Sequence, residues 1–317
     1  MAPTNFRRIQ MKQIWTASMM TLLLTALFSF RAEAAKLKIV TTTPDFASVA
    51  REIGGDRVEV SSLAKGTQDP HFVDAKPSFI RQLNQADLLI DGGADLEIGW
   101  LPPLVENSRN HKIQTGNPGR IVASTGVNLT GIPDRPIDRS QGDVHPLGNP
   151  HYMLDPENGK IVGEQIAAAL CRLDGRSCEQ YRKNETAFNQ HLNQKIAEWT
   201  QKLTPYRGAK ILTYHDSWPY FAERFGLNIV GHVEPKPGIP PSPGHLATLV
   251  DLIMREKAKV VIMEPYFSDQ APKFLAEKTG IRVLVLNPSV APEAGINSYF
   301  DLFDQDIAQL AETLAKK

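Results

Sequence analysis

Two hydrophobic periodicities alternate along the chain after Ala35. Short runs rich in β-branched residues are typical of buried strands, and the stretches between them carry apolar residues at helical spacing. This alternation predicts parallel sheets covered by helices. The predicted strands are 37–42, 58–63, 86–91, 120–123, 210–214, 227–230, 259–263 and 282–286. The predicted helices are 43–53, 79–84, 158–172, 177–203, 218–225, 243–257, 270–279 and 299–316.

The helix at 177–203 is distinctive because it contains neither Gly nor Pro. At 1.5 Å per residue it would span about 40 Å, enough to run the height of a two-lobed molecule. We therefore predict an α/β fold of two βαβ lobes with central parallel sheets, joined by one long rigid α-helix. We place the N-terminal lobe at 35–175, the linking helix at 176–204 and the C-terminal lobe at 205–317.

The first 34 residues have the features of a signal peptide. Basic residues precede an uncharged stretch at 14–30, and Ala32-Glu33-Ala34 offers a small-x-small cleavage site. A retained N-terminal anchor and a later start at Met11 are the alternatives. No Cys follows the segment directly, so we expect a free periplasmic protein without a lipid anchor.

Charge and cysteine content narrow the function classes. Lys+Arg and Asp+Glu number 35 each, so the chain lacks the excess of basic residues that nucleic-acid-binding proteins usually have. Cys171 and Cys178 are the two cysteines. In an oxidising compartment such a close pair is expected to form a disulfide bond. Two free buried thiols are the alternative, and a metal-binding pair is disfavoured because no His lies nearby.

Three histidines follow predicted strands or a long loop. His71 comes after the strand at 58–63, and His215 follows the strand at 210–214. His151 directly follows a Pro- and Gly-rich loop at 126–150 and begins a helical segment. Ligands of open α/β sheets bind outside the carboxyl ends of the strands, so two facing lobes would bring these imidazoles together in the cleft between them.

Three neutral imidazoles are suited to zinc. Asp155 and Asp216 lie near two of these histidines, and they could hold a second ring nitrogen or order nearby backbone. For the fourth ligand we predict Glu264, at the end of the strand at 259–263, with Asn287 or a water as alternatives. His145, in the long loop, is a candidate accessory site that recruits metal.

Several segments resemble the zinc/manganese substrate-binding proteins of bacterial ABC importers. They occur in the same order over nearly the whole chain after the signal peptide. They are Asp69-Pro70-His71, Asn149-Pro150-His151 with Leu154-Asp155-Pro156, Tyr214-His215-Asp216, the Pro-rich 237–243 and Glu264-Pro265.

The resemblance implies two α/β lobes linked by one long helix, with metal held at the lobe interface by the residues matching His71, His151 and His215. Members that favour manganese carry a carboxylate where His215 stands, which favours zinc here. Two positions depart from the family pattern. Asn287 stands where members usually carry Asp, and the His/Asp-rich loop of many zinc members is reduced to Asp143 and His145.

We therefore predict a periplasmic solute-binding protein that captures Zn²⁺ and delivers it to an ABC importer, without enzymatic activity. The expected partners are the inner-membrane permease with its cytoplasmic ATPase, a metallochaperone is a further candidate, and the protein is expected to be a monomer. One alternative is a carrier of Mn²⁺ or iron with the same architecture. A second alternative is a zinc hydrolase, since three histidines and a water can also build catalytic zinc.

Overall fold

The computed structural model describes residues 35–134, 142 and 144–316. The signal peptide predicted for residues 1–34 lies outside the described residues. Residues Lys36–Lys317 form one compact unit. Within the described part of the chain, no helix combines the length and the apolar character needed to cross a membrane.

The first four strands form one parallel sheet in the order β2-β1-β3-β4. The strands are β1 (Leu37–Thr41), β2 (Val58–Ser62), β3 (Leu88–Asp91) and β4 (Arg120–Val122). Successive side chains of a strand point to opposite faces. Ile39 therefore packs in the cluster that contains α2 (Pro44–Gly54) and α5 (Pro156–Leu173), whereas Val40 packs with α3 (Pro77–Gln85) and α4 (Leu101–Ser108).

The last four strands repeat this arrangement in the order β6-β5-β7-β8. They are β5 (Lys210–Thr213), β6 (Asn228–His232), β7 (Val260–Met263) and β8 (Arg282–Val285). Leu212 of β5 packs on the side of α8 (Pro243–Glu256) and α9 (Gln270–Thr279). Ile211 packs on the opposite side, in the cluster that contains α7 (Pro219–Phe225) and α10 (Tyr299–Ala315).

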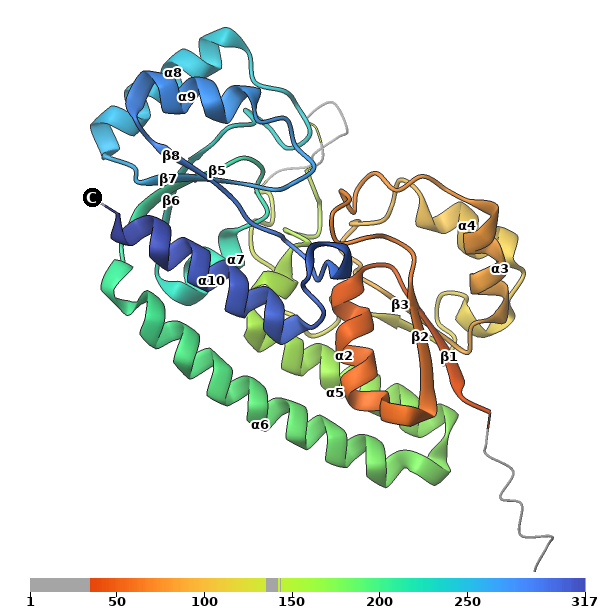
Figure 1. The fold of residues 1–317 in the computed structure, drawn as a ribbon. Helices are drawn as coiled ribbons and strands as arrows, with labels where there is room; N and C mark the ends of the chain where they lie inside the picture. The colour runs from red at the N-terminus through yellow and green to blue at the C-terminus, as the bar shows by residue number, and fades with distance from the viewer. Residues whose placement is uncertain (1–34, 135–141, 143, 317) are drawn as a thin grey trace, which may run out of the picture. The chain divides into compact units, whose positions relative to one another are not determined.

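The long helix α6 (Cys178–Leu203) runs along both sheets (Figure 1). It contacts α2 and α5 near the first sheet and α10 near the second. Its buried side chains include Phe188 and Trp199, and they belong to one continuous apolar cluster that takes in residues of both sheets. Moving one sheet against the other would open this shared core, which favours a rigid frame.

The turn between α5 and α6 is closed by a disulfide bond between Cys171 and Cys178. The predicted pairing is therefore confirmed, and neither thiol is free. Since Cys178 is the first residue of α6, the bond ties the start of the long helix to the end of α5.

The predicted fold class is confirmed, and each predicted strand or helix is present with both ends within two residues of the prediction. Helix α4 was not predicted. Adjacent prolines, Pro102 and Pro103, occupy its first turn, where their missing N–H groups cost nothing. In the sequence they read as a break, not as a helix start.

Candidate metal centre

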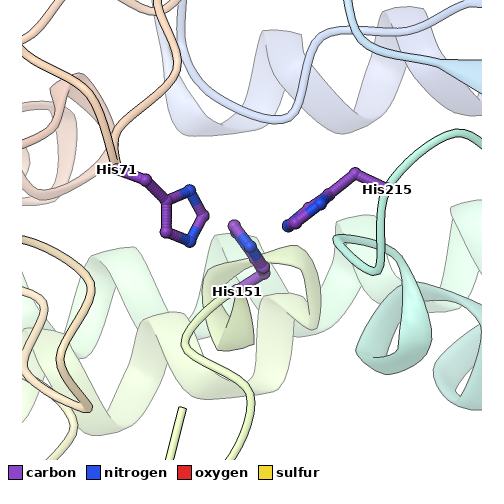
Figure 2. Close-up of side chains that lie close together, drawn as sticks. All are labelled: His71, His151 and His215. Atoms are coloured by element: carbon purple, nitrogen blue, oxygen red, sulfur yellow. The ribbon is translucent and has the colours of Figure 1, made fainter. Parts of the chain in front are cut away.

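Three histidine rings meet where the carboxyl ends of the two sheets face each other. His71 lies between β2 and α3, His215 is the second residue after β5, and His151 precedes α5. One nitrogen of each ring lies within 4.8 Å of the corresponding nitrogens of the other two. Figure 2 shows the three rings turned toward a common point from separate segments of the chain. The predicted convergence of His71, His151 and His215 is therefore present in the fold.

The loop before His71 orients its ring. Asp69 Oδ1 accepts a hydrogen bond from the His71 backbone N–H at 2.9 Å and also lies 2.9 Å from the ring Nδ1. Trp100 donates to the Pro70 carbonyl at 2.9 Å, which fixes the backbone beside the ring. Burial acts to raise the pKa of Asp69, but the hydrogen bond and charge of His71 lower it overall. A carboxylate beside Nδ1 keeps the proton there, so Nε2 presents its lone pair to the centre.

His151 is held by a neighbouring amide. The Asn149 side chain accepts from the His151 backbone N–H at 2.9 Å and donates to the Asp216 carbonyl at 2.6 Å. Asn149 therefore connects the segment before α5 to the loop that carries His215. The Nε2 atom of His151 is buried without a hydrogen-bond partner. Burial first, and the nearby His71, His215 and His145 next, lower the pKa of His151 well below its ordinary value, so the ring is neutral.

His215 is oriented by Glu234, which follows β6. Glu234 Oε2 lies 2.7 Å from His215 Nδ1 and accepts the Gly238 backbone N–H at 3.0 Å. Burial acts to lower the pKa of His215, but Glu234 and Glu264 raise it above its ordinary value. As with His71, the carboxylate holds the proton on Nδ1 and leaves Nε2 available to a cation.

Two predicted outer carboxylates have other roles. Asp155 accepts from the Glu157 backbone N–H at the start of α5 and pairs with Arg224 at 2.7 Å. Asp216 does not hold the His215 ring nitrogen, because Glu234 occupies that position. Asp155 therefore orders backbone, which was the other expectation, and Asp216 Oδ2 accepts from the Asn149 side chain at 3.3 Å.

Sequence reasoning gave no role to Asp69 or Glu234. Asp69 stands two residues before His71, a spacing that lets one carboxylate bond both the backbone and the ring. Glu234 follows β6, which pairs with β5, the strand that leads to His215. Its place at the carboxyl end of a neighbouring strand was a usable signal.

Glu264 follows β7 and is completely buried. Trp218 donates to its Oε1 at 3.0 Å, while Oε2 has no hydrogen-bond partner. Burial raises its pKa to about 7, against the opposing charge of His215. Among the described His, Cys, Asp and Glu residues, the group with ligand atoms within 4.8 Å of one another contains only the three histidines. Glu264 as a ligand therefore stays a prediction, as does Asn287.

A fourth histidine touches the group. His145 Nε2 lies 3.1 Å from His71 Nε2, and the two ring centroids are 5.1 Å apart. A pocket of about 50 Å³ is lined by His145, His151 and His215 together with Asn149 and Asp216. Neutral nitrogen donors around a small pocket can hold a divalent transition-metal ion.

Known proteins share this sequence pattern and fold. Residues 39–313 match the family described as zinc-uptake complex component A, periplasmic. The manganese ABC transporter substrate-binding lipoprotein PsaA of Streptococcus anginosus is 27% identical over 289 residues, covering 89% of this chain and 90% of its own. The metal ABC transporter substrate-binding lipoprotein FimA of Streptococcus parasanguinis is 26% identical over 322 residues, covering 96% of this chain and 100% of its own.

Solved structures of ZnuA match the fold of this chain. A crystal structure of ZnuA matches with a TM-score of 0.74 and 25% identity, covering 88% of this chain and all of that one. A ZnuA deletion mutant with zinc bound matches with a TM-score of 0.74 and 26% identity, covering 89% of this chain and 99% of that one. This family consists of transport proteins that bind substrate, not of enzymes. The chain therefore belongs to the family of periplasmic zinc-uptake components, and it is a substrate-binding protein of a metal ABC transporter.

Proposed function

We propose that this protein binds Zn²⁺ in the periplasm through His71, His151 and His215 and delivers it to its transporter. Substrate-binding proteins of ABC transporters work with a membrane permease and an ATPase. Here the permease would receive the ion. The observation that carries the proposal is the convergence of three imidazole nitrogens within 4.8 Å. Two of the rings have carboxylates on their other nitrogen, an arrangement that zinc-binding histidines commonly have.

Zinc is favoured over manganese by the donor atoms. Imidazole nitrogens suit zinc, whereas manganese prefers carboxylate, carbonyl and water oxygens. All three residues of the converging group are histidines, and the predicted carboxylate ligand, Glu264, lies outside that group. The names of the relatives point both ways, because PsaA is a manganese transporter component and the ZnuA mutant was solved with zinc.

Competition calorimetry on the metal-free protein tests the proposal. Zinc should displace manganese at equal concentrations, and His151→Ala should weaken zinc binding at least tenfold. The matched control is His111→Ala, which removes an exposed histidine from another part of the fold. Preferential binding of manganese would instead support the alternative carrier, and unchanged zinc affinity in His151→Ala would refute the assigned site.

A further inference from the structure

The loop histidine His145 is placed against a proposed metal ligand, not in solvent. Its Nε2 lies 3.1 Å from His71 Nε2, although 74 positions separate the two residues. In a tetrahedral zinc site with bonds of about 2.0–2.1 Å, neighbouring nitrogens lie about 3.3 Å apart. The observed separation is close to that of two ligands sharing an edge of the tetrahedron.

The hydrogen bonds of His71 determine what its ring offers to His145. Asp69 beside Nδ1 holds the ring proton, so the Nε2 facing His145 is a lone pair in the neutral ring. Without metal, His145 must present an N–H to that lone pair. With a cation between the rings, both nitrogens present lone pairs to the ion, and no proton is needed.

The backbone on both sides of His145 approaches other segments closely. Gly148, with φ at 110°, donates to the His145 carbonyl at 3.2 Å, and a Cβ at this position would lie 2.9 Å from the Thr130 carbonyl oxygen. Gly142 comes so near the Pro237 carbonyl that a Cβ there would lie 2.2 Å from its oxygen. The backbone on either side of His145 therefore lies close to the first-lobe loop at Thr130, whose carbonyl accepts from the Asn149 N–H at 2.7 Å, and to the second-lobe loop at Pro237.

A pocket beside these rings has room for an ion. His145, His151 and His215 all line it, and its volume of about 50 Å³ exceeds the roughly 10–15 Å³ that a water-sized species requires. The buried Nε2 of His151 has no partner in the described structure and is available to a ligand. Because His145 lies outside the group within 4.8 Å, its half-buried ring must shift to share an ion with all three.

We propose that His145 is the fourth ligand of the bound zinc ion, so that the site consists of four imidazoles. The inference rests on the proposed function, because it assumes that His71, His151 and His215 hold the ion. A fourth nitrogen takes the position that a carboxylate oxygen would otherwise occupy. The site then contains no oxygen donor, which discriminates further against manganese.

The test is X-ray absorption and visible spectroscopy on the full mature protein with one equivalent of Zn²⁺ or Co²⁺. The wild type should show four imidazole nitrogens. His145→Gln should show three imidazoles and one oxygen, move the Co²⁺ visible bands to lower energy and lower zinc affinity at least about tenfold. His111→Gln, the matched control, should leave spectra and affinity unchanged.

The outcomes separate this inference from the proposed function. Three imidazoles and one oxygen in the wild type, with His145→Gln unchanged, would overturn the role of His145 and leave the three-histidine site intact. If Glu264→Gln then altered that spectrum, the fourth ligand would be Glu264. Unchanged zinc affinity in both His151→Ala and His215→Ala would refute the proposed function itself.

Discussion

Replacing Glu234 by Gln tests whether the carboxylate beside His215 Nδ1 changes the affinity of the proposed metal site. Glu234 Oε2 lies 2.7 Å from His215 Nδ1, and both side chains are buried. Gln can still accept the ring N–H, so the tautomer is kept and only the negative charge is lost. A charge-assisted hydrogen bond contributes about twice as much as a neutral one, or about 1.5–3 against 0.5–1.5 kcal/mol. We therefore expect a loss of about 1.4 kcal/mol, or roughly tenfold in zinc affinity.

Competition titration of the metal-free protein with a chromophoric zinc chelator at about pH 7.5 measures this difference. Glu223→Gln is the matched control. Glu223 is exposed on α7, so this substitution removes the same charge from outside the site. Thermal unfolding without metal would show whether Glu234→Gln merely weakens the fold.

The pH dependence of the lost zinc affinity shows whether Glu234→Gln acts through its charge or through the geometry of the site. Glu234 helps to raise the pKa of His215, so its removal lowers that pKa and weakens proton competition in acid. The affinity gap between wild type and variant should therefore narrow as the pH falls toward about 5.5. Equal affinities for wild type, Glu223→Gln and Glu234→Gln at neutral pH would refute the reasoning.

Three further predictions concern acid, the disulfide and the frame. Because His215 has a pKa raised above the ordinary 6.5 and must be neutral to bind metal, zinc affinity should fall at least about 30-fold from pH 7.5 to pH 5 by calorimetry. Unchanged affinity would contradict this. Replacing Cys171 and Cys178 by Ser opens a short loop with a sequence separation of 7 and should lower the free energy of unfolding by about 2.5 kcal/mol in denaturant titrations, with zinc affinity retained. Because both sheets share one core, solution scattering should show the radius of gyration changing by less than about 1 Å on adding zinc, and a large compaction would show that the lobes move.

Local sequence patterns were enough to select the three histidines of the candidate metal centre. His71 and His215 were chosen because they follow strands. Their convergence required that the parallel strands of each sheet end at one edge and that the two lobes face each other at those edges. The placement of His151 depended on its position before a helix. The partners of the rings were harder to predict, since Asp216 is the nearer carboxylate in sequence but Glu234 is the one that meets His215.

The sequence by itself determined the order and extent of the strands and helices, because periodicity and Gly, Pro and capping residues act within a few positions. It also determined which side chains carry ligand chemistry, and that Cys171 and Cys178 were close enough to pair. Only the tertiary structure decided that both sheets share one core and that His145 meets His71 across 74 positions. Such contacts depend on how loops pack against one another, and this packing reflects the whole fold and leaves no local pattern in the residues that make it.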